Sequence, residues 1–205
     1  EEENCPAPLT AASVGPYGAY LADGSEYRGD YGKTREELAD FHRERIHILA
    51  EAGPDVFACE TIPCLVEALA ETDVLSEIPG AEAWISFSCK DGLHTCGGDL
   101  ISDCAKALKD IKEVAAIGIN CTAPQYVESL IKEIVKVTDK PVVVYPNSGE
   151  DYDAGSKSWE GSAANYEDYV KIWYEAGARL IGGCCRTGPE DIRKVAAFRK
   201  SLIEK

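Results

Sequence analysis

The sequence alternates between short apolar runs rich in β-branched residues and longer segments with the spacing of amphipathic helices. This alternation is typical of βαβ units, whose parallel strands are buried on both faces. The predicted strands are residues 9–16, 55–63, 83–88, 114–121, 141–149 and 178–185. Because they recur at intervals of a few tens of residues, we expect one α/β domain that spans residues 1–205.

Helix signals fill the intervals between the predicted strands. Thr34 and Glu37 form a capping-box pattern at the start of a helix that should end near Gly53. A later segment carries apolar residues at the i, i+3, i+4, i+7, i+8 spacing of a core-facing helix, namely Val127, Leu130, Ile131, Ile134 and Val135. Both segments are therefore expected to be helices that pack on the sheet.

Two folds share this alternation, the (β/α)8 TIM-type barrel and the open doubly wound sheet, and both bind ligands at the carboxyl ends of their strands. The segments 51–60 and 175–184 each contain a helix end, a glycine and a strand, and superposing them places Glu60 opposite Cys184 at those ends. Six strand–helix units are recognisable, whereas a closed barrel has eight in about 250 residues. As a barrel, the chain would lack two units at its front. No GxGxxG or GxxxxGK[ST] pattern follows a predicted strand, so nothing indicates a nucleotide site.

The composition narrows the range of partners. The formal net charge is −15, which argues against nucleic acid or an anionic membrane surface as a partner. No apolar run approaches the roughly 20 residues of a membrane span, and no signal-peptide pattern opens the chain. Nine cysteines without the pattern of a small disulfide-bonded domain indicate free or metal-bound thiols. We therefore expect a protein of a reducing compartment, the cytoplasm.

Three cysteines end predicted strands of equal parity. Cys121 ends the strand 114–121, and Cys184 with Cys185 ends the strand 178–185, so that one other strand lies between. In a barrel such strands direct side chains into the same layer, which would bring three thiols together. Three thiolates suit Zn²⁺ and leave a fourth tetrahedral position open for a thiol substrate, whose proton the metal would displace. The alternatives are small buried residues or a vicinal pair that oxidises, and the spacing alone does not decide.

Five motifs occur in order from about residue 9 to the end of the chain. They are VGPYGAYLADGSEYRGDYG (14–32), CETIP (59–63), GINCTAP (118–124), VYPNSGEDYD (144–153) and GGCCRTGPEDI (182–192). Together they resemble the homocysteine S-methyltransferase family, and most closely its branch that uses S-methylmethionine or S-adenosylmethionine.

The resemblance implies a (β/α)8 barrel of which this chain is the carboxyl-terminal two-thirds, because nothing here matches the family's first two strand–helix units. It implies Zn²⁺ held by Cys121, Cys184 and Cys185. Homocysteine would bind the metal through sulfur, and its thiolate would take a methyl group from a sulfonium donor by in-line displacement, giving methionine. The donor would leave as a neutral thioether, so no general acid is needed.

Other residues are candidates for binding the substrate. Glu60 is the carboxylate expected to bind the amino group of homocysteine, and a salt bridge to a neighbouring helix is its alternative role. Asn120 and Asn147 could hydrogen-bond the substrate or position loops. Tyr145 could shield or transiently fill the open metal position, and Arg186 could bind the substrate carboxylate or stabilise its own loop.

The remaining polar residues are expected to have ordinary roles. The long loop 14–32, rich in glycine and tyrosine, suits either a lid that offers aromatic faces to a sulfonium cation or a plain surface loop. His42 and His47 lie in the charged stretch FHRERIH and should be solvated, and His94 lies in a polar loop. The other cysteines match no ligand position and are expected to be structural: Cys5, Cys59, Cys64, Cys89, Cys96 and Cys104.

Two rival functions remain open. One is a non-catalytic, barrel-derived zinc-binding scaffold, which would apply if 205 residues is the natural length. The other is a homocysteine methyltransferase that uses betaine or a folate donor, and the lack of an extra domain to hold a folate or cobalamin weighs against a folate donor. The sequence does not reveal the oligomeric state.

Overall fold

The computed structural model describes residues 7–153, 158–161 and 163–203. Its centre is a six-stranded parallel sheet with the strand order β1-β2-β3-β4-β5-β8. The strands are β1 (Ala11–Val14), β2 (Val56–Ile62), β3 (Ala83–Phe87), β4 (Val114–Asn120), β5 (Val142–Tyr145) and β8 (Ala178–Ile181). All six predicted strands are confirmed, and each ends earlier than its predicted range.

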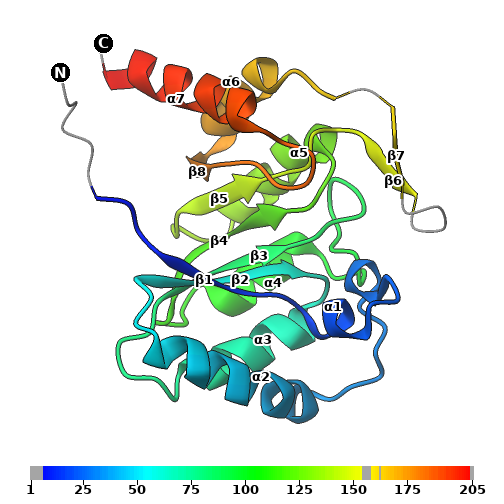
Figure 1. Cartoon of the computed structure of the whole chain (residues 1–205), viewed down its shortest axis with the longest axis vertical. Helices are drawn as coiled ribbons and strands as arrows, with labels where there is room; N and C mark the ends of the chain where they lie inside the picture. The colour runs from blue at the N-terminus through cyan, green and yellow to red at the C-terminus, as the bar shows by residue number, and fades with distance from the viewer. Residues whose placement is uncertain (1–6, 154–157, 162, 204–205) are drawn as a thin grey trace.

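A helix comes after each of these six strands, and each of the first five leads back to the start of the next strand of the sheet. These helices are α2 (Arg35–Glu51), α3 (Leu65–Leu75), α4 (Ile101–Leu108), α5 (Pro124–Val135), α6 (Tyr166–Ala176) and α7 (Pro189–Ile203). The connection from β1 to α2 also contains α1 (Tyr17–Leu21) and the 3-10 turn η1 (Ser25–Tyr27), and a hairpin of β6 (Asp151–Asp153) and β7 (Ser158–Glu160) precedes α6. Figure 1 shows α1 and this hairpin on the same side of the molecule.

The strand order distinguishes between the two folds that the sequence left open. In a doubly wound sheet the order reverses at a switch point, whereas here each strand pairs with the next one of the sheet in a single direction. Right-handed crossovers in one direction place all the helices on one face of the sheet, as in a barrel. In Figure 1, α2 and α3 cover one end of the row of strands and α6 and α7 the other. The chain thus contains six strand–helix units of a barrel, with β1 and β8 at the two edges.

The two faces of the sheet differ in character. The face toward the helices is apolar and includes the fully buried Ile85, Ile117 and Val144. Because side chains alternate along a strand, the opposite face carries different residues, among them Glu60 and Tyr145 near the carboxyl ends of β2 and β5. This second face, the inner face of the barrel, therefore supplies polar groups at the end where the strands lead into their loops.

The predicted helix signals are confirmed with one exception. Thr34 and Glu37 make both hydrogen bonds of a capping box at the start of α2. On α5, the apolar stripe from Val127 to Ile134 is buried, but Val135 is 42% exposed because the helix ends at this residue. Within the described residues, no helix combines the length and the apolar character that crossing a membrane requires.

Candidate metal and substrate site

Three sulfur atoms from two separate loops meet at the carboxyl ends of the strands. Cys121 directly follows β4, and Cys184 and Cys185 lie in the loop after β8, with β5 between the two strands. The Sγ of Cys121 lies 2.7 Å from the Sγ of Cys184 and 3.9 Å from that of Cys185, and the Sγ atoms of Cys184 and Cys185 are 3.9 Å apart. Among the described residues, this is the one group of three His, Cys, Asp or Glu side chains placed to hold a metal ion.

The local backbone explains how adjacent cysteines can face the same point. The strand β8 ends at Ile181, so Cys184 and Cys185 are released from the alternation of a regular strand. Gly183 packs so closely on Thr187 that a Cβ atom would overlap the threonine side chain. Cys121 has a φ of 45°, in the left-handed region, which turns the chain sharply after β4.

The segment after β5 ties the two cysteine loops together through main-chain hydrogen bonds. The Cys184 amide donates to the Pro146 carbonyl over 2.9 Å, and the Ser148 amide donates to the Cys185 carbonyl over 3.0 Å. The Asn147 amide donates to the carbonyl of Thr122, the residue after Cys121, over 3.1 Å. The Pro-Asn-Ser turn therefore fixes the position of all three sulfurs relative to one another.

The electrostatics of the cluster favour a bound cation. Hydrogen bonds from Cys121 and then from Cys184 lower the pKa of the Cys185 thiol to about 3. Hydrogen bonds to Cys184 and Cys185, followed by burial, raise the pKa of Cys121. For Cys184 the bond with Cys121 lowers the pKa, but the bond to Cys185 and burial outweigh it and raise the value to about 11. The three thiols therefore cannot all ionise together unless a cation lies among them.

The donor set fits zinc. Thiolates are ligands that Zn²⁺ prefers, and tetrahedral coordination with Zn–S bonds of about 2.3 Å separates the sulfurs by about 3.8 Å. Two of the three sulfur–sulfur distances, at 3.9 Å, already match this value. The third, at 2.7 Å between Cys121 and Cys184, must lengthen by about 1 Å.

Glu60 lies in a polar group on the inner face. Its Oε1 accepts a hydrogen bond of 2.5 Å from the Ser13 hydroxyl on β1. The Tyr145 hydroxyl accepts a hydrogen bond of 2.9 Å from the Trp84 indole N–H. Burial, and then the negative charge of Glu60, raise the pKa of the Tyr145 phenol. Tyr145 is thus placed beside the carboxylate, with Trp84 holding its hydroxyl.

The two predicted asparagines differ in what their side chains contact. Asn120 is buried, and its amide is paired with Thr61: the Thr61 N–H donates to Oδ1 over 2.7 Å, and Nδ2 donates to the Thr61 hydroxyl over 2.8 Å. Asn120 therefore holds the turn after Glu60. The buried Oδ1 of Asn147 has no hydrogen-bond partner within the described part of the chain, which leaves it available to a ligand.

Arg186 is engaged within its own loop region. Its Nε and terminal nitrogen donate to both carboxylate oxygens of Glu150, over 3.0 and 3.2 Å, and this hydrogen bonding lowers the pKa of Glu150. The Arg186 side chain is 53% exposed. To reach a substrate carboxylate it would have to exchange partners.

Sequence reasoning did not single out Tyr27. This half-buried residue ends η1, and burial, followed by the charge of Cys121 and Cys185, raises the pKa of its phenol. The phenol of Tyr27 is thus within range of the electrostatic influence of the sulfurs. The one indication in the sequence was the place of Tyr27 in the long loop 14–32. The chain has ten tyrosines, and nothing in the sequence distinguishes this one from the others.

The expectation for one histidine was wrong. His42 is fully buried, whereas His47 is 45% exposed as expected and pairs with Glu77. His42 lies on the side of α2 that faces α3, so the charged neighbours in the sequence did not indicate its environment. Outside the cluster, Cys59, Cys64, Cys89 and Cys104 are buried and Cys96 is half-buried, and Cys5 lies outside the described residues.

The fold and this site together define the class of the protein, a (β/α) barrel with a three-cysteine centre at the carboxyl ends of its strands. Comparison with known sequences makes the class more specific. The profile of the homocysteine S-methyltransferase family matches residues 2–198. The chain therefore belongs to the homocysteine S-methyltransferase family.

Individual relatives agree with this assignment. The chain is 57% identical to homocysteine S-methyltransferase YbgG of Bacillus subtilis, over 97% of this chain and 64% of that protein. It is 52% identical to homocysteine S-methyltransferase 2 of Arabidopsis thaliana, over 96% of this chain and 60% of the relative. The crystal structure of the metallated form of the homocysteine methyltransferase MmuM from Escherichia coli superposes with a TM-score of 0.82 at 44% identity, covering 93% of this chain and 61% of MmuM. The chain spans less than two thirds of the length of each.

Proposed function

We propose that this chain supplies the zinc and homocysteine site of an enzyme that transfers a methyl group from a sulfonium donor, S-methylmethionine or S-adenosylmethionine, to homocysteine. The observation that carries the proposal is the convergence of three sulfurs within 3.9 Å of one another from two separated loops. Membership of the family and the metallated form of the E. coli relative support it.

Cys121, Cys184 and Cys185 would hold the metal as thiolates. Zinc, when bound, supplies a Lewis acid that lowers the pKa of a thiol, which is otherwise about 8.5 and mostly protonated at neutral pH. Within the chain, the Pro-Asn-Ser turn after β5 fixes the spacing of the sulfurs by main-chain hydrogen bonds. This arrangement reduces the rearrangement needed when the metal enters.

The remaining polar groups would orient the amino acid part of homocysteine. Glu60, oriented by the Ser13 hydroxyl and flanked by Tyr145, presents a carboxylate for the ammonium group. The Oδ1 of Asn147, which has no partner among the described residues, is a second acceptor at the same rim. Arg186 could bind the substrate carboxylate by giving up one of its bonds to Glu150.

The transfer itself needs little from acid–base groups of the chain. The homocysteine thiol would release its proton to water, its sulfur forms the new bond to the methyl carbon, and the electron pair of the breaking carbon–sulfur bond returns to the donor sulfur. The donor departs as a neutral thioether, so no side chain has to protonate it. The role left to the chain is to align the two sulfurs and exclude water. Tyr27 and the loop 14–32 would cover the donor and offer an aromatic face to its cation.

At the scale of the chain, we propose one domain that forms the carboxyl-terminal two-thirds of a barrel and acts in the cytoplasm on small molecules.

The test is an assay of methyl transfer to homocysteine from each sulfonium donor and from betaine. It uses the chain alone and the chain fused to the part of the B. subtilis relative that the alignment leaves uncovered. Transfer from a sulfonium donor in the fused protein, lost in Cys184→Ser, is the expected result. Zinc binding without transfer from any donor would favour a non-catalytic scaffold instead.

A further inference from the structure

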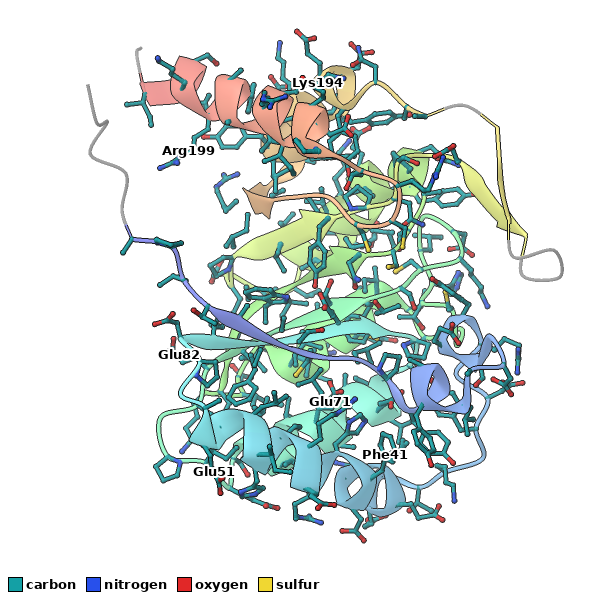
Figure 2. The ribbon with its side chains drawn as sticks, in the orientation of Figure 1. Phe41, Glu51, Glu71, Glu82, Lys194 and Arg199 are labelled. Carbon is teal, nitrogen blue, oxygen red and sulfur yellow. The ribbon has the colours of Figure 1, made fainter. Side chains whose placement is uncertain are left out.

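A cluster of buried polar side chains lies on the opposite side of the sheet from the sulfurs, between the strands and the helices α2 and α3. His42, Glu67 and Glu71 are all fully buried. Figure 2 shows Glu71 between α2 and the strands, and Phe41 on α2 near α1. Burying such groups costs free energy unless hydrogen bonds compensate. His42 and Glu67 make such hydrogen bonds, and the chain of bonds that includes them reaches the backbone of the loop after β1.

The bonds form a relay with a defined direction. One terminal nitrogen of Arg45 donates both to the carbonyl of Gly15 and to Nδ1 of His42, each over 2.7 Å. Because a guanidinium group only donates, Nδ1 accepts, and the proton of the neutral ring is on Nε2. Nε2 then donates to Oε1 of Glu67 over 3.0 Å, and the same oxygen accepts the Tyr17 amide over 2.5 Å. Both ends of the relay thus bind the main chain, one residue to either side of Pro16.

Glu71 is the other buried carboxyl group near the His42 ring. Glu71 lies 3.6 Å from Nδ1, and burial, followed by the charge of Glu67, raises its pKa well above the usual value. Cys59 faces Glu71, and Tyr31 faces Glu67 from the loop before α2.

The main chain that the relay holds continues into α1 and η1, which are linked to the loop of Cys121 by further hydrogen bonds. Tyr17 begins α1, and Gly18 packs so closely on the amide of Glu26 that a Cβ atom could not fit there. The short helix and η1 therefore move as one unit. Within η1, the Glu26 carbonyl accepts a hydrogen bond of 3.4 Å from the Ser88 hydroxyl. The amide of the next residue, Cys89, donates to the hydroxyl of Thr122, the residue after Cys121, over 3.0 Å.

We propose that Arg45, His42 and Glu67 are positioning residues, which fix the loop after β1 so that α1 and η1 are held against the loops that lead to the sulfur cluster. None of the three contacts the cluster, and they act through the backbone of Gly15 and Tyr17. This inference extends the proposed function, because it attributes the position of the loop after β1 to side chains of α2 and α3.

The test compares three variants of the chain by residue-level hydrogen exchange without metal or substrate. His42→Leu removes both bonds of the ring, and His42→Gln restores one donor and one acceptor. His47→Leu is the matched control, because His47 lies five residues further along the same helix and is exposed. We expect exchange of the Tyr17 amide to be about 10-fold faster or more in His42→Leu, with smaller effects through residues 18–27. Exchange should return close to the unmodified rate in His42→Gln and remain unchanged in His47→Leu.

Other outcomes overturn the inference. Unchanged exchange at Tyr17 in His42→Leu would show that the relay does not hold the loop, and equally faster exchange in α5 would show a general loss of stability. Failure of His42→Gln to restore the rate would also contradict it. If His42→Leu does not fold, Arg45→Met at the half-buried end of the relay is measured by the same criteria.

A second measurement connects the loop to catalysis. In the fused protein, His42→Leu should raise KM for the sulfonium donor more than it lowers kcat, and His42→Gln should restore KM. An unchanged KM would contradict the link between the relay and the site. If the fused protein has no activity, the proposed function fails, and the exchange experiment still decides whether the relay positions the loop.

Discussion

Each sulfur of the cluster is positioned by main-chain hydrogen bonds of neighbouring loops. The Cys184 amide binds the Pro146 carbonyl, and the Cys185 carbonyl accepts from the Ser148 amide. A side-chain substitution at these cysteines should therefore change metal binding while leaving the loops in place.

Replacing one of the three sulfur atoms tests whether the cysteine side chains bind the metal. In Cys184→Ser, we expect zinc affinity to fall by at least about 100-fold, because loss of even an outer partner of a ligand costs about 10- to 100-fold. Competition with a chromophoric chelator measures the change. Cys96→Ser, at a half-buried thiol outside the cluster, should bind zinc as the unmodified chain does. Equal affinities for both variants would rule out Cys184 as a ligand.

Individual residues show where sequence reasoning succeeds. Cys121, Cys184 and Cys185 could be found because each follows a recognisable strand, and strand ends meet at one rim. His42 could not, because its burial depends on how α2 packs against α3, which the charged residues around it do not reveal. The partners of Arg186 and Asn120 also depend on contacts between distant loops.

At the scale of elements, Gly118 on β4 marks a place where two strands pack too closely for a side chain. A Cβ atom there would overlap the Val143 carbonyl of β5, which is backbone and cannot move aside. We expect Gly118→Ala to lower the free energy of unfolding by about 3 kcal/mol or more. Urea denaturation measures it, and Gly15→Ala is the control, since nothing lies near its added Cβ. A loss below about 1 kcal/mol would mean that the strands can separate without cost.

The packing of α3 against β2 predicts a dependence of stability on pH. Glu71 is fully buried with its pKa raised, so its contribution to stability is complete below the pKa of the unfolded chain and is lost as the pH rises through the folded-state value. Glu71→Gln imitates the protonated acid and should not show this loss. We expect it to exceed the unmodified chain in unfolding free energy by about 1–3 kcal/mol at pH 8, and by much less at pH 5.

The matched control for this pH effect is Glu51→Gln on α2, whose side chain is exposed. Figure 2 shows Glu51 on the outer side of α2, away from the strands. Its unfolding free energy should follow that of the unmodified chain at both pH values. A Glu71→Gln chain with the same pH dependence as the unmodified one would show that Glu71 is ionised in the fold.

The strands that sequence patterns predicted and the strands that they missed differ in length and burial. The six sheet strands are apolar runs covered on both faces, so they stand out from the helices between them. The hairpin of β6 and β7 was missed, because strands of three residues carry too few positions for an alternation to be recognised. Strand ends were overestimated because the predicted ranges included the first residues of the rim loops, 146–149 after β5 and 182–185 after β8.

The whole molecule combines an apolar outer face, covered by helices, with a polar inner face that ends at the sulfurs. The direction of strand order, which distinguishes a barrel from a doubly wound sheet, is a property of the entire sheet and could not be derived from any single segment. The sequence indicated six units, and the structure has six. The family resemblance, carried by motifs at the strand ends, was needed to choose the barrel before the strand order was known.

The central claim is that three sulfurs from two separated loops hold one metal and leave a place for a fourth sulfur. X-ray absorption at the zinc edge of the zinc-loaded chain tests it most directly. We expect three sulfur neighbours at about 2.3 Å and one lighter atom, and four sulfur neighbours after homocysteine is added. Two or fewer sulfur neighbours, or a shell that homocysteine does not change, would contradict it.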